Sequence, residues 1–246
     1  MLNVKDHKKY RRIVGQTLWL SSVRRDIAFA VKELSKFVHA PTSEDMNHAM
    51  WLLKYLAGTR DECIFLKPEK LNGKLEITAY TDADLGGCSS SRKSTSGGCI
   101  ALNGTIFHTW AKQQQTIADS SAESEFIGMA QACKEIKYVE EVLDEMNIIL
   151  NKVPTLYIDN TAAMAMLTTN IKSRVKHLDR KVYWTREFIQ MDNVIVKHID
   201  GKLNLADIFT KFVSNDVLTR LKPAVMGKSK PPTVVIPKNK IKLEET

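Results

Sequence analysis

The sequence predicts an α/β protein with a mixed sheet, preceded by a small helical region. Two patterns along the chain predict this arrangement. Apolar residues recur at helical spacing through residues 8–58, and from residue 75 onward β-prone segments come first and then alternate with helical ones. The composition is that of a globular protein, because 43% of the 246 residues are hydrophobic and 26% are charged.

The first region, residues 1–70, is predicted to contain three helices. The segments KYRRIVGQTLWLSSVRR and DIAFAVKELSKFVH place apolar side chains near helical spacing. Pro41 interrupts this pattern, Ser43 is predicted to cap the third helix, EDMNHAMWLLKYLAG, and Gly58 to end it. These helices contain no acidic cluster and no metal-ligand spacing, so packing is their predicted role. The segment 67–74, KPEKLNGK, is predicted to link them to the second unit.

The second unit, residues 71–222, is predicted to begin with strands. LEITAYTD alternates as a strand that ends at Asp82. GGCIALNGTIFHTW predicts a β-hairpin, because Asn103-Gly104 is the residue pair that a type I′ turn requires. Further strands are predicted at TLYID and NVIVKHID, and helices at 121–146, at NTAAMAMLTTN, at 176–191 and at NLADIFTKFV with Asn204 as its cap. Residues 223–246 are rich in Pro and Lys and are predicted to be a flexible basic tail.

Four acidic residues form the candidate site: Asp82, Glu125, Asp159 and Asp207. Each lies where a predicted strand ends or a predicted helix begins, so residues distant in sequence can converge. Four carboxylates without a supporting His/Cys set suit hard divalent cations such as Mg²⁺. Two such ions clamp the attacking and leaving oxygens of a phosphodiester displacement, so the pattern predicts a nuclease. Singly, Asp159 can also be explained as a helix N-cap, and Asp207 as a first-turn aspartate that the helix dipole favours.

Neighbouring acids compete with two of these residues. Ser120-Ser121-Ala122-Glu123 fits a capping box, which explains Glu123 structurally and leaves Glu125 as the site candidate. Asp84 precedes Leu85-Gly86-Gly87, a turn in which aspartate is common, so Asp82 is favoured over Asp84.

Basic residues predict a polyanionic partner. The net charge is +8 and the sequence pI is about 9.2. The segment 171–187 interleaves basic and aromatic residues, which leaves open both a nucleic-acid contact and an ordinary amphipathic helix. Its candidate nucleic-acid-binding residues are Lys172, Arg174, Lys176, Arg180, Lys181 and Trp184. His198, on the last predicted strand, is either structural or a proton shuttle to the leaving group.

Other classes of protein are disfavoured. The cysteines, Cys63, Cys88, Cys99 and Cys133, occur singly, which favours reduced thiols and argues against structural zinc. No stretch approaches the length of an apolar membrane span, and the N-terminus is too polar for a secretory signal. The chain has no GxxxxGK loop, no GxGxxG fingerprint and no Ser-His-Asp arrangement.

Several motifs follow one another in a characteristic order: YTDADLGG, SRKSTSGG, WAKQQ, SSAESEF, IDNTAA, KHLDRK and LADIFTK. Together they resemble the ribonuclease H domain of copia-type LTR-retrotransposon Pol polyproteins. The preceding helical segments resemble the thumb or connection that follows the reverse-transcriptase palm, so the resemblance covers roughly residues 8–215. Two positions depart from it: Arg24-Arg25-Asp26-Ile27 stands where the family has TRPDI, and Phe212 where it has a proline.

The resemblance implies a five-stranded mixed sheet flanked by helices and hydrolysis of the RNA strand in RNA–DNA hybrids with two Mg²⁺ or Mn²⁺ ions. It assigns catalysis and metal binding to Asp82, Glu125, Asp159 and Asp207, and it places His198 near the family's mobile histidine. The implied partners are the hybrid and the fingers and palm of the reverse transcriptase, because this chain has no Tyr-x-Asp-Asp polymerase motif. The implied location is the cytoplasm, within virus-like particles, with the basic tail as a nuclear address in the other reading. The alternative function is an inactive remnant that binds nucleic acid or a polymerase partner.

Overall fold

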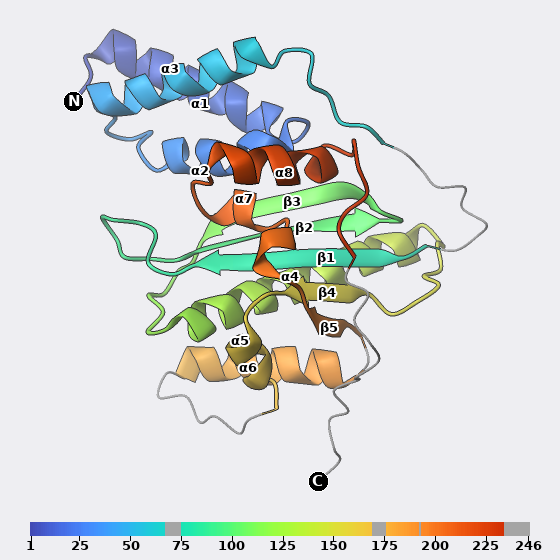
Figure 1. The fold of residues 1–246 in the computed structure, drawn as a ribbon. Helices are drawn as coiled ribbons and strands as arrows, with labels where there is room; N and C mark the ends of the chain where they lie inside the picture. The colour runs from blue at the N-terminus through green and yellow to red at the C-terminus, as the bar shows by residue number, and fades with distance from the viewer. Residues whose placement is uncertain (67–74, 169–175, 192, 234–246) are drawn as a thin grey trace.

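The computed structural model describes residues 1–66, 75–168, 176–191 and 193–233, and a five-stranded mixed sheet lies at its centre (Figure 1). The strands are β1 (Ile77–Asp84), β2 (Thr95–Leu102), β3 (Thr105–Gln113), β4 (Thr155–Ile158) and β5 (Ile195–His198). Their order is β3-β2-β1-β4-β5. The pairs β1–β2 and β2–β3 are antiparallel, whereas β1–β4 and β4–β5 are parallel. The predicted fold class is confirmed: this is a ribonuclease H-like sheet with flanking helices.

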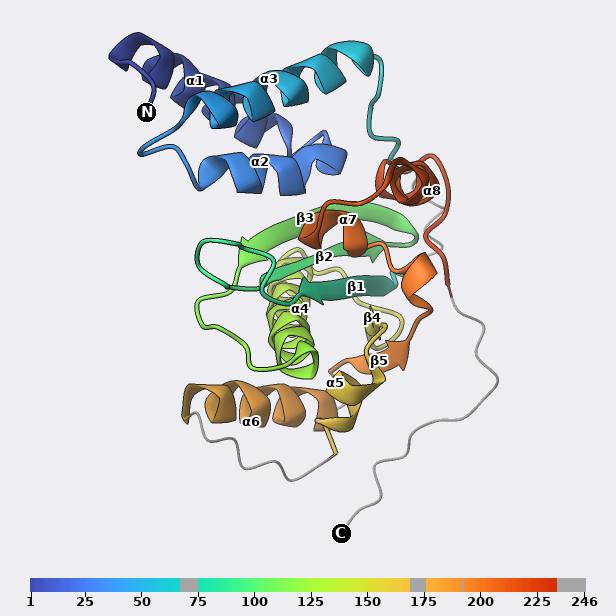
Figure 2. The same cartoon turned by 60° about the vertical axis from the view of Figure 1, so that its left-hand side comes forward.

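Helices cover both faces of the sheet, as the two views in Figure 1 and Figure 2 show. The long helix α4 (Ser121–Glu145) packs along β1 and β2, and α5 (Thr161–Ala165) and α6 (Lys176–Gln190) pack on its outer side. On the opposite face lie a 3₁₀ turn (Gly201–Leu203), α7 (Asp207–Thr210) and α8 (Asn215–Val225). The short α7 contacts all three antiparallel strands, so its position is fixed by the sheet.

The N-terminal region forms three helices, as predicted: α1 (Val4–Leu20), α2 (Ala28–Ser35), preceded by a 3₁₀ turn (Arg25–Ile27), and α3 (Ser43–Gly58). They bury a core of their own and dock on the sheet through α2, which packs against β3 and α7. Lys32 Nζ donates to Thr95 Oγ1 at 2.6 Å, and the Arg25 guanidinium donates to the carbonyl of Ile106. The region is therefore packed on the sheet by specific polar contacts.

A buried ion network adds a second link, between the N-terminal helices and α8. The Asp26 carboxylate accepts from the Arg24 guanidinium at 2.8 and 2.9 Å and from the Tyr55 hydroxyl at 2.6 Å, and its side chain is fully buried. Lys222 of α8 lies 3.7 Å from the same carboxylate and donates to the Tyr55 hydroxyl at 3.0 Å. The Arg24-Arg25-Asp26-Ile27 segment, which departs from the TRPDI motif of the resemblance, is thus the segment that holds this network.

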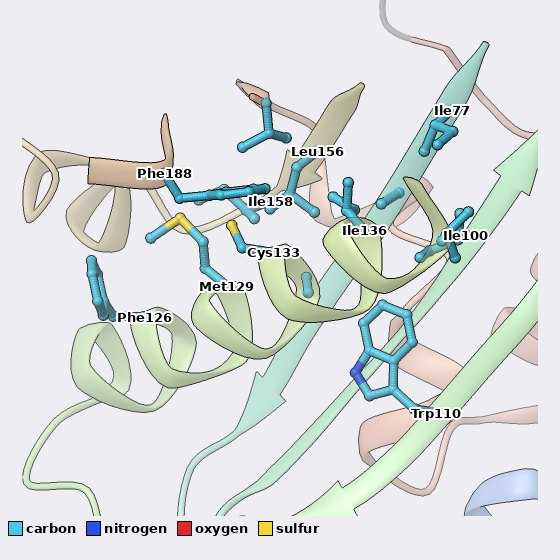
Figure 3. Packing of buried hydrophobic residues seen from close by; sticks show 14 of the residues in the cluster. Ile77, Ile100, Trp110, Phe126, Met129, Cys133, Ile136, Leu156, Ile158 and Phe188 are labelled. Carbon is cyan, nitrogen blue, oxygen red and sulfur yellow. The ribbon is translucent and has the colours of Figure 1, made fainter. Parts of the chain in front are cut away.

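The apolar core lies between α4 and the sheet (Figure 3). Met129, Cys133 and Ile136 line the inner side of α4 and are fully buried. Figure 3 shows them facing Leu156 and Ile158 of β4, so this side of the helix packs directly on the sheet.

Several local predictions hold. The turn between β2 and β3 has positive φ at both Asn103 (46°) and Gly104 (76°), as a type I′ turn requires. Ser120 caps α4 by accepting from the backbone N–H of Glu123 at 3.1 Å. Glu123 in turn accepts at 2.9 Å from the N–H of Asp119, one residue before the predicted cap amide, so its structural explanation stands.

Other local predictions are wrong by a few residues. The strand β1 continues beyond Asp82 to Asp84, because Asp84 still pairs with Thr95 and the turn begins only at the glycines that follow. The cap of α3 is Thr42, whose side chain and backbone form a capping box with Asp45. Asn204 does not cap a long final helix. Its amide instead donates to the carbonyl of Thr81 at 3.0 Å, and the predicted helix is divided into α7 and α8.

The packed part of the chain extends past residue 222, where the basic tail is predicted to begin. Val225 and Met226 are fully buried, and the Met226 carbonyl accepts from the N–H of Phe65 at 2.9 Å. The Tyr80 hydroxyl donates to the carbonyl of Pro232 at 2.9 Å. The first residues of the predicted tail are thus ordered by contacts with the sheet, and residues 234–246 lie outside the described part of the chain.

Candidate metal centre

Three of the four predicted acids meet at one end of the sheet. Asp82 lies near the end of β1 and Asp159 directly follows β4, and these two strands are parallel neighbours, so their ends lie side by side. Asp207 is the first residue of α7, which packs on β1. One carboxylate oxygen from each of the three lies within 4.8 Å of the others. The cap of α5 is Asn160, so the N-cap explanation of Asp159 falls away.

Glu125 stands outside this group of three but lines the same hollow. It lies in the first turns of α4 and is 6% exposed. Its Oε2 atom is buried and has no hydrogen-bond partner among the described residues. Burial, followed by the negative charges of Asp82 and Asp159, raises the pKa of Glu125 to about 10. A buried carboxyl oxygen without a partner is costly, and a cation in the hollow would remove that cost.

The hollow is about 630 Å³ in volume and lies between the end of β1, the start of α4 and the segment after β4. Its lining residues are Asp82, Ala83, Asp84, Leu85, Ser121, Glu125, Asp159, Asn160, Thr161, Ala162 and Lys211. Asp84 thus belongs to the lining, although the sequence analysis assigned it to a turn.

Two residues that the sequence analysis missed hold the acids in place. The Thr210 hydroxyl donates to Asp82 Oδ2. The Lys211 ammonium lies 2.8 Å from Asp207 Oδ1 and 3.4 Å from Asp82 Oδ2. Both follow Asp207 by one helical turn in the quoted motif LADIFTK, so the signal was the i, i+3 and i, i+4 spacing from a site aspartate.

The electrostatics reflect the crowding of negative charge. Burial, partly offset by the ion pair with Lys211, raises the pKa of Asp207 to about 6. Burial and the neighbouring charge of Asp82 raise the pKa of Asp159. Burial alone would lower the pKa of Lys211, but the charges of Asp82 and Asp207 outweigh it and raise that pKa. The carboxylates of the site therefore repel one another, and the positive charge of Lys211 offsets part of that repulsion.

A glycine allows α7 to approach the acids. Gly97 of β2 pairs with Asp82, and a Cβ at Gly97 would lie 2.7 Å from Phe209 Cβ and from Thr210 Cγ2. Any larger residue would push α7 away from the sheet, and with it Asp207 and Thr210. The glycine-rich motif SRKSTSGG thus has a packing role in the centre.

His198 contacts the site only through the backbone. Its Nε2 donates to the carbonyl oxygen of Asp159 at 3.1 Å, and the ring is absent from the lining of the hollow. This contact joins β5 to the end of β4, beside the site aspartate. The geometry matches the structural role more closely than the proton shuttle.

The candidate nucleic-acid-binding residues are only partly visible. Lys172 and Arg174 lie outside the described residues, as do the side chains of Lys176 and Lys181 on α6. Arg180 is exposed. Trp184 is half-buried, and its ring stacks on Phe188 with centroids 5.2 Å apart, with Lys134 Nζ 5.8 Å from its centroid. The described part of α6 therefore has the packing of an amphipathic helix, with Arg180 on its exposed side.

The donor set suits a hard divalent cation. The converging ligands are carboxylate oxygens, which Mg²⁺ and Mn²⁺ prefer. The unpartnered Oε2 of Glu125 lines the same hollow. The acidic cluster can therefore bind metal through Asp82, Asp159 and Asp207.

The sequence also has relatives among known proteins. It is 33% identical to the Retrovirus-related Pol polyprotein from transposon RE1 of Arabidopsis thaliana over 229 residues, 89% of this chain and 15% of that polyprotein. It is 30% identical to the polyprotein from transposon TNT 1-94 of Nicotiana tabacum over 207 residues, 83% of this chain and 15% of that one. The chain belongs to the copia-type Pol polyprotein family. It matches the reverse transcriptase and ribonuclease H portion of these polyproteins and spans about 15% of their length.

Solved structures add the following likenesses. The N-terminal ribonuclease H domain of a Mycobacterium tuberculosis protein is 10% identical and covers 63% of this chain and 100% of its own, with a TM-score of 0.41. LC11-RNase H1, isolated from compost, is 15% identical and covers 59% of this chain and 96% of its own, with a TM-score of 0.42. At these TM-scores, neither likeness adds to the fold seen in the strand order. No protein-family model matches the chain.

Among the helices of the described residues, none combines the length and the apolar character that a membrane span requires.

Proposed function

We propose that this chain is a metal-dependent ribonuclease H that hydrolyses the RNA strand of RNA–DNA hybrids during retrotransposon reverse transcription. The observation that carries the proposal is the convergence of Asp82, Asp159 and Asp207, from three separate elements, within 4.8 Å. Membership of the copia-type Pol family supports it, because the matching region of those polyproteins includes their ribonuclease H portion. Glu125, buried at the same hollow with an unpartnered oxygen, completes the proposed site.

The chain's own residues have distinct roles in this proposal. Asp82, Glu125, Asp159 and Asp207 would hold two Mg²⁺ or Mn²⁺ ions. Such ions, when bound, supply Lewis-acid activation of the attacking water and charge stabilisation at the leaving 3′-oxygen. Thr210 would orient the Asp82 carboxylate through its hydroxyl donor. His198 would hold the backbone of Asp159 instead of transferring a proton.

The proposed substrate is consistent with the charge of the chain. A net charge of +8 favours a polyanion, and basic side chains would bind phosphates while the 2′-hydroxyl distinguishes RNA from DNA. We assign the phosphate contacts to the basic segment of α6 and the residues just before it: Lys172, Arg174, Lys176, Arg180 and Lys181, with Trp184 beside them. The proposed partner is the fingers and palm region of the polyprotein's reverse transcriptase.

The test is cleavage of RNA–DNA hybrid, duplex DNA and duplex RNA by the purified chain with Mg²⁺. We expect cleavage of the hybrid alone, abolished in Asp82→Asn and Asp159→Asn while hybrid binding is retained. Asp216→Asn, an exposed first-turn residue of α8, is the matched control and should cleave as wild type does. Wild-type rates in either site variant would show the site assignment to be wrong.

One observation favours a second candidate, an inactive nucleic-acid-binding remnant. The ammonium of Lys211 pairs with Asp82 and Asp207, so two of the acids have a partner without any metal. A chain that binds hybrid but leaves it intact at millimolar Mg²⁺ and Mn²⁺ would support this candidate over the ribonuclease.

A further inference from the structure

Lys211 occupies the position between two acids of the candidate metal centre. It directly follows α7 and caps its C-terminal end. Its Nζ lies 2.8 Å from Asp207 Oδ1 and 3.4 Å from Asp82 Oδ2. The side chains of Asp82 and Asp207 are 4% and 15% exposed, whereas that of Lys211 is 40% exposed. The lysine thus approaches buried carboxylates from the solvent side.

Among the described residues, the ammonium of Lys211 is the one cationic group in a strongly acidic lining. Of the described residues that line the hollow, Lys211 alone is basic, while Asp82, Asp84, Glu125 and Asp159 are acidic. The negative charges of these neighbouring carboxylates repel one another, and the repulsion grows as water is excluded. One positive charge among these acids therefore stabilises the folded chain before any metal arrives.

The carboxylate oxygens that pair with the Lys211 ammonium cannot at the same time coordinate a divalent metal ion closely. A divalent ion would need carboxylate oxygens at about 2.0–2.6 Å, in the space that the ammonium borders. Ammonium and divalent cation would also repel each other across a few ångströms. The Lys211 side chain is 40% exposed, which gives the ammonium a route outward, into the hollow and solvent.

We propose that Lys211 is a displaceable counter-ion: its ammonium pairs with Asp82 and Asp207 in the metal-free chain and leaves these carboxylates when a divalent cation binds. This inference rests on the proposed function for the identity of the metal centre. Divalent binding includes the cost of breaking the Lys211 ion pairs, so the lysine weakens metal affinity. In return, the chain folds with its site formed in the absence of metal.

The test compares Lys211→Met, which keeps the apolar stem and removes the charge, with the wild-type full chain. Mn²⁺ binding is measured by calorimetric titration without nucleic acid, and thermal unfolding is measured in chelator and in Mn²⁺. We expect Lys211→Met to bind Mn²⁺ about tenfold more tightly, because one unit charge near the ion is removed. Its unfolding temperature in chelator should fall, and the gain on adding Mn²⁺ should exceed that of wild type.

Two further variants separate the effect from general charge removal. Lys197→Met, at an exposed position of β5, should keep the wild-type Mn²⁺ affinity, and Lys211→Arg, which keeps the charge, should remain close to it. Unchanged or weaker Mn²⁺ binding by Lys211→Met would overturn the proposal. A Lys211→Met chain that stays unfolded in saturating Mn²⁺ would overturn it too, since the metal would then fail to replace the ammonium.

The outcome is independent of the cleavage assay. Tighter Mn²⁺ binding by Lys211→Met, with no cleavage by the wild-type chain, would refute the ribonuclease and leave the counter-ion role in place. Cleavage by wild type, with unchanged affinity in the variant, would refute the counter-ion role alone.

Discussion

Replacing Glu125 by glutamine should stabilise the metal-free protein while destroying the proposed site. Burial, followed by the charges of Asp82 and Asp159, raises the pKa of Glu125 from 4.5 to about 10. In the unfolded chain the same carboxyl ionises near its ordinary value. Between pH 4.5 and about pH 10, the folded state therefore keeps a proton on Glu125 that the unfolded state releases.

The sign follows from this difference. A carboxyl whose pKa is raised on folding contributes stability that is fully present below pH 4.5 and is lost as the pH rises towards 10. The loss is about 1.4 kcal/mol per pH unit, which gives about 4 kcal/mol near pH 7.5. Glutamine has a similar shape and no proton to lose. The advantage of Glu125→Gln over wild type should therefore grow by about 1.4 kcal/mol per unit across this window.

Urea unfolding in chelator at pH 6, 7 and 8 measures the advantage. Glu123→Gln is the matched control on the same helix, because Glu123 is only partly buried and its oxygen accepts a backbone N–H that a glutamine oxygen can also accept. It should change stability by less than about 0.5 kcal/mol at every pH. A Glu125→Gln variant that is no more stable than wild type, or whose advantage is flat with pH, would refute the reasoning. In Mn²⁺ the difference in free energy of unfolding between Glu125→Gln and wild type should become smaller, since the metal compensates the charge of the ionised glutamate only in wild type.

Two further predictions concern packing around the centre. Gly97→Ala should cost about 1 to 3 kcal/mol in urea unfolding and weaken Mn²⁺ binding, because the added methyl collides with α7. Gly15→Ala in α1, where nothing lies within 4 Å, is its control and should be neutral or stabilise by up to about 1 kcal/mol; equal effects at both positions would contradict the packing role. Asp26→Asn should cost about 3 to 5 kcal/mol in urea unfolding, because it leaves Arg24 and Lys222 without their buried partner. Faster proteolysis of α1–α3 should accompany that loss, and a variant as stable and as resistant as wild type would show that the network does not hold the N-terminal helices against α8.

Much of the fold could be predicted because its signals are local. The turn at Asn103-Gly104 and the cap at Ser120 depend on residues within one turn of one another, and both are present. Helical periodicity predicted the presence and order of α1, α2 and α3, although not their exact ends. The errors are at the ends of elements, because those ends depend on residues distant in the chain. Pairing with Thr95 extends β1 to Asp84, and the side-chain amide of Asn204 donates to the carbonyl of Thr81 instead of capping a long helix.

Only part of the candidate site could be predicted from such local signals. Carboxylates at element ends could be selected by chemistry, and capping removed Glu123 from the set. Thr210 and Lys211 were overlooked, because their role depends on Asp82, which is 128 residues from Thr210. Their spacing from Asp207 was visible in the sequence, but nothing local distinguished it from ordinary helix chemistry.

The sequence by itself determined the chemistry of this protein: four acids at element ends, a basic chain, and the order of motifs that indicates the copia-type Pol family. Only the tertiary structure decided which oxygens meet, that Lys211 pairs with two of the acids, and that Gly97 lets α7 come close enough to bring Asp207 to the cluster. The reason is physical. Residue type and short-range spacing set what a side chain can do, whereas distances of a few ångströms between residues far apart in the chain are set by how the sheet and its helices pack.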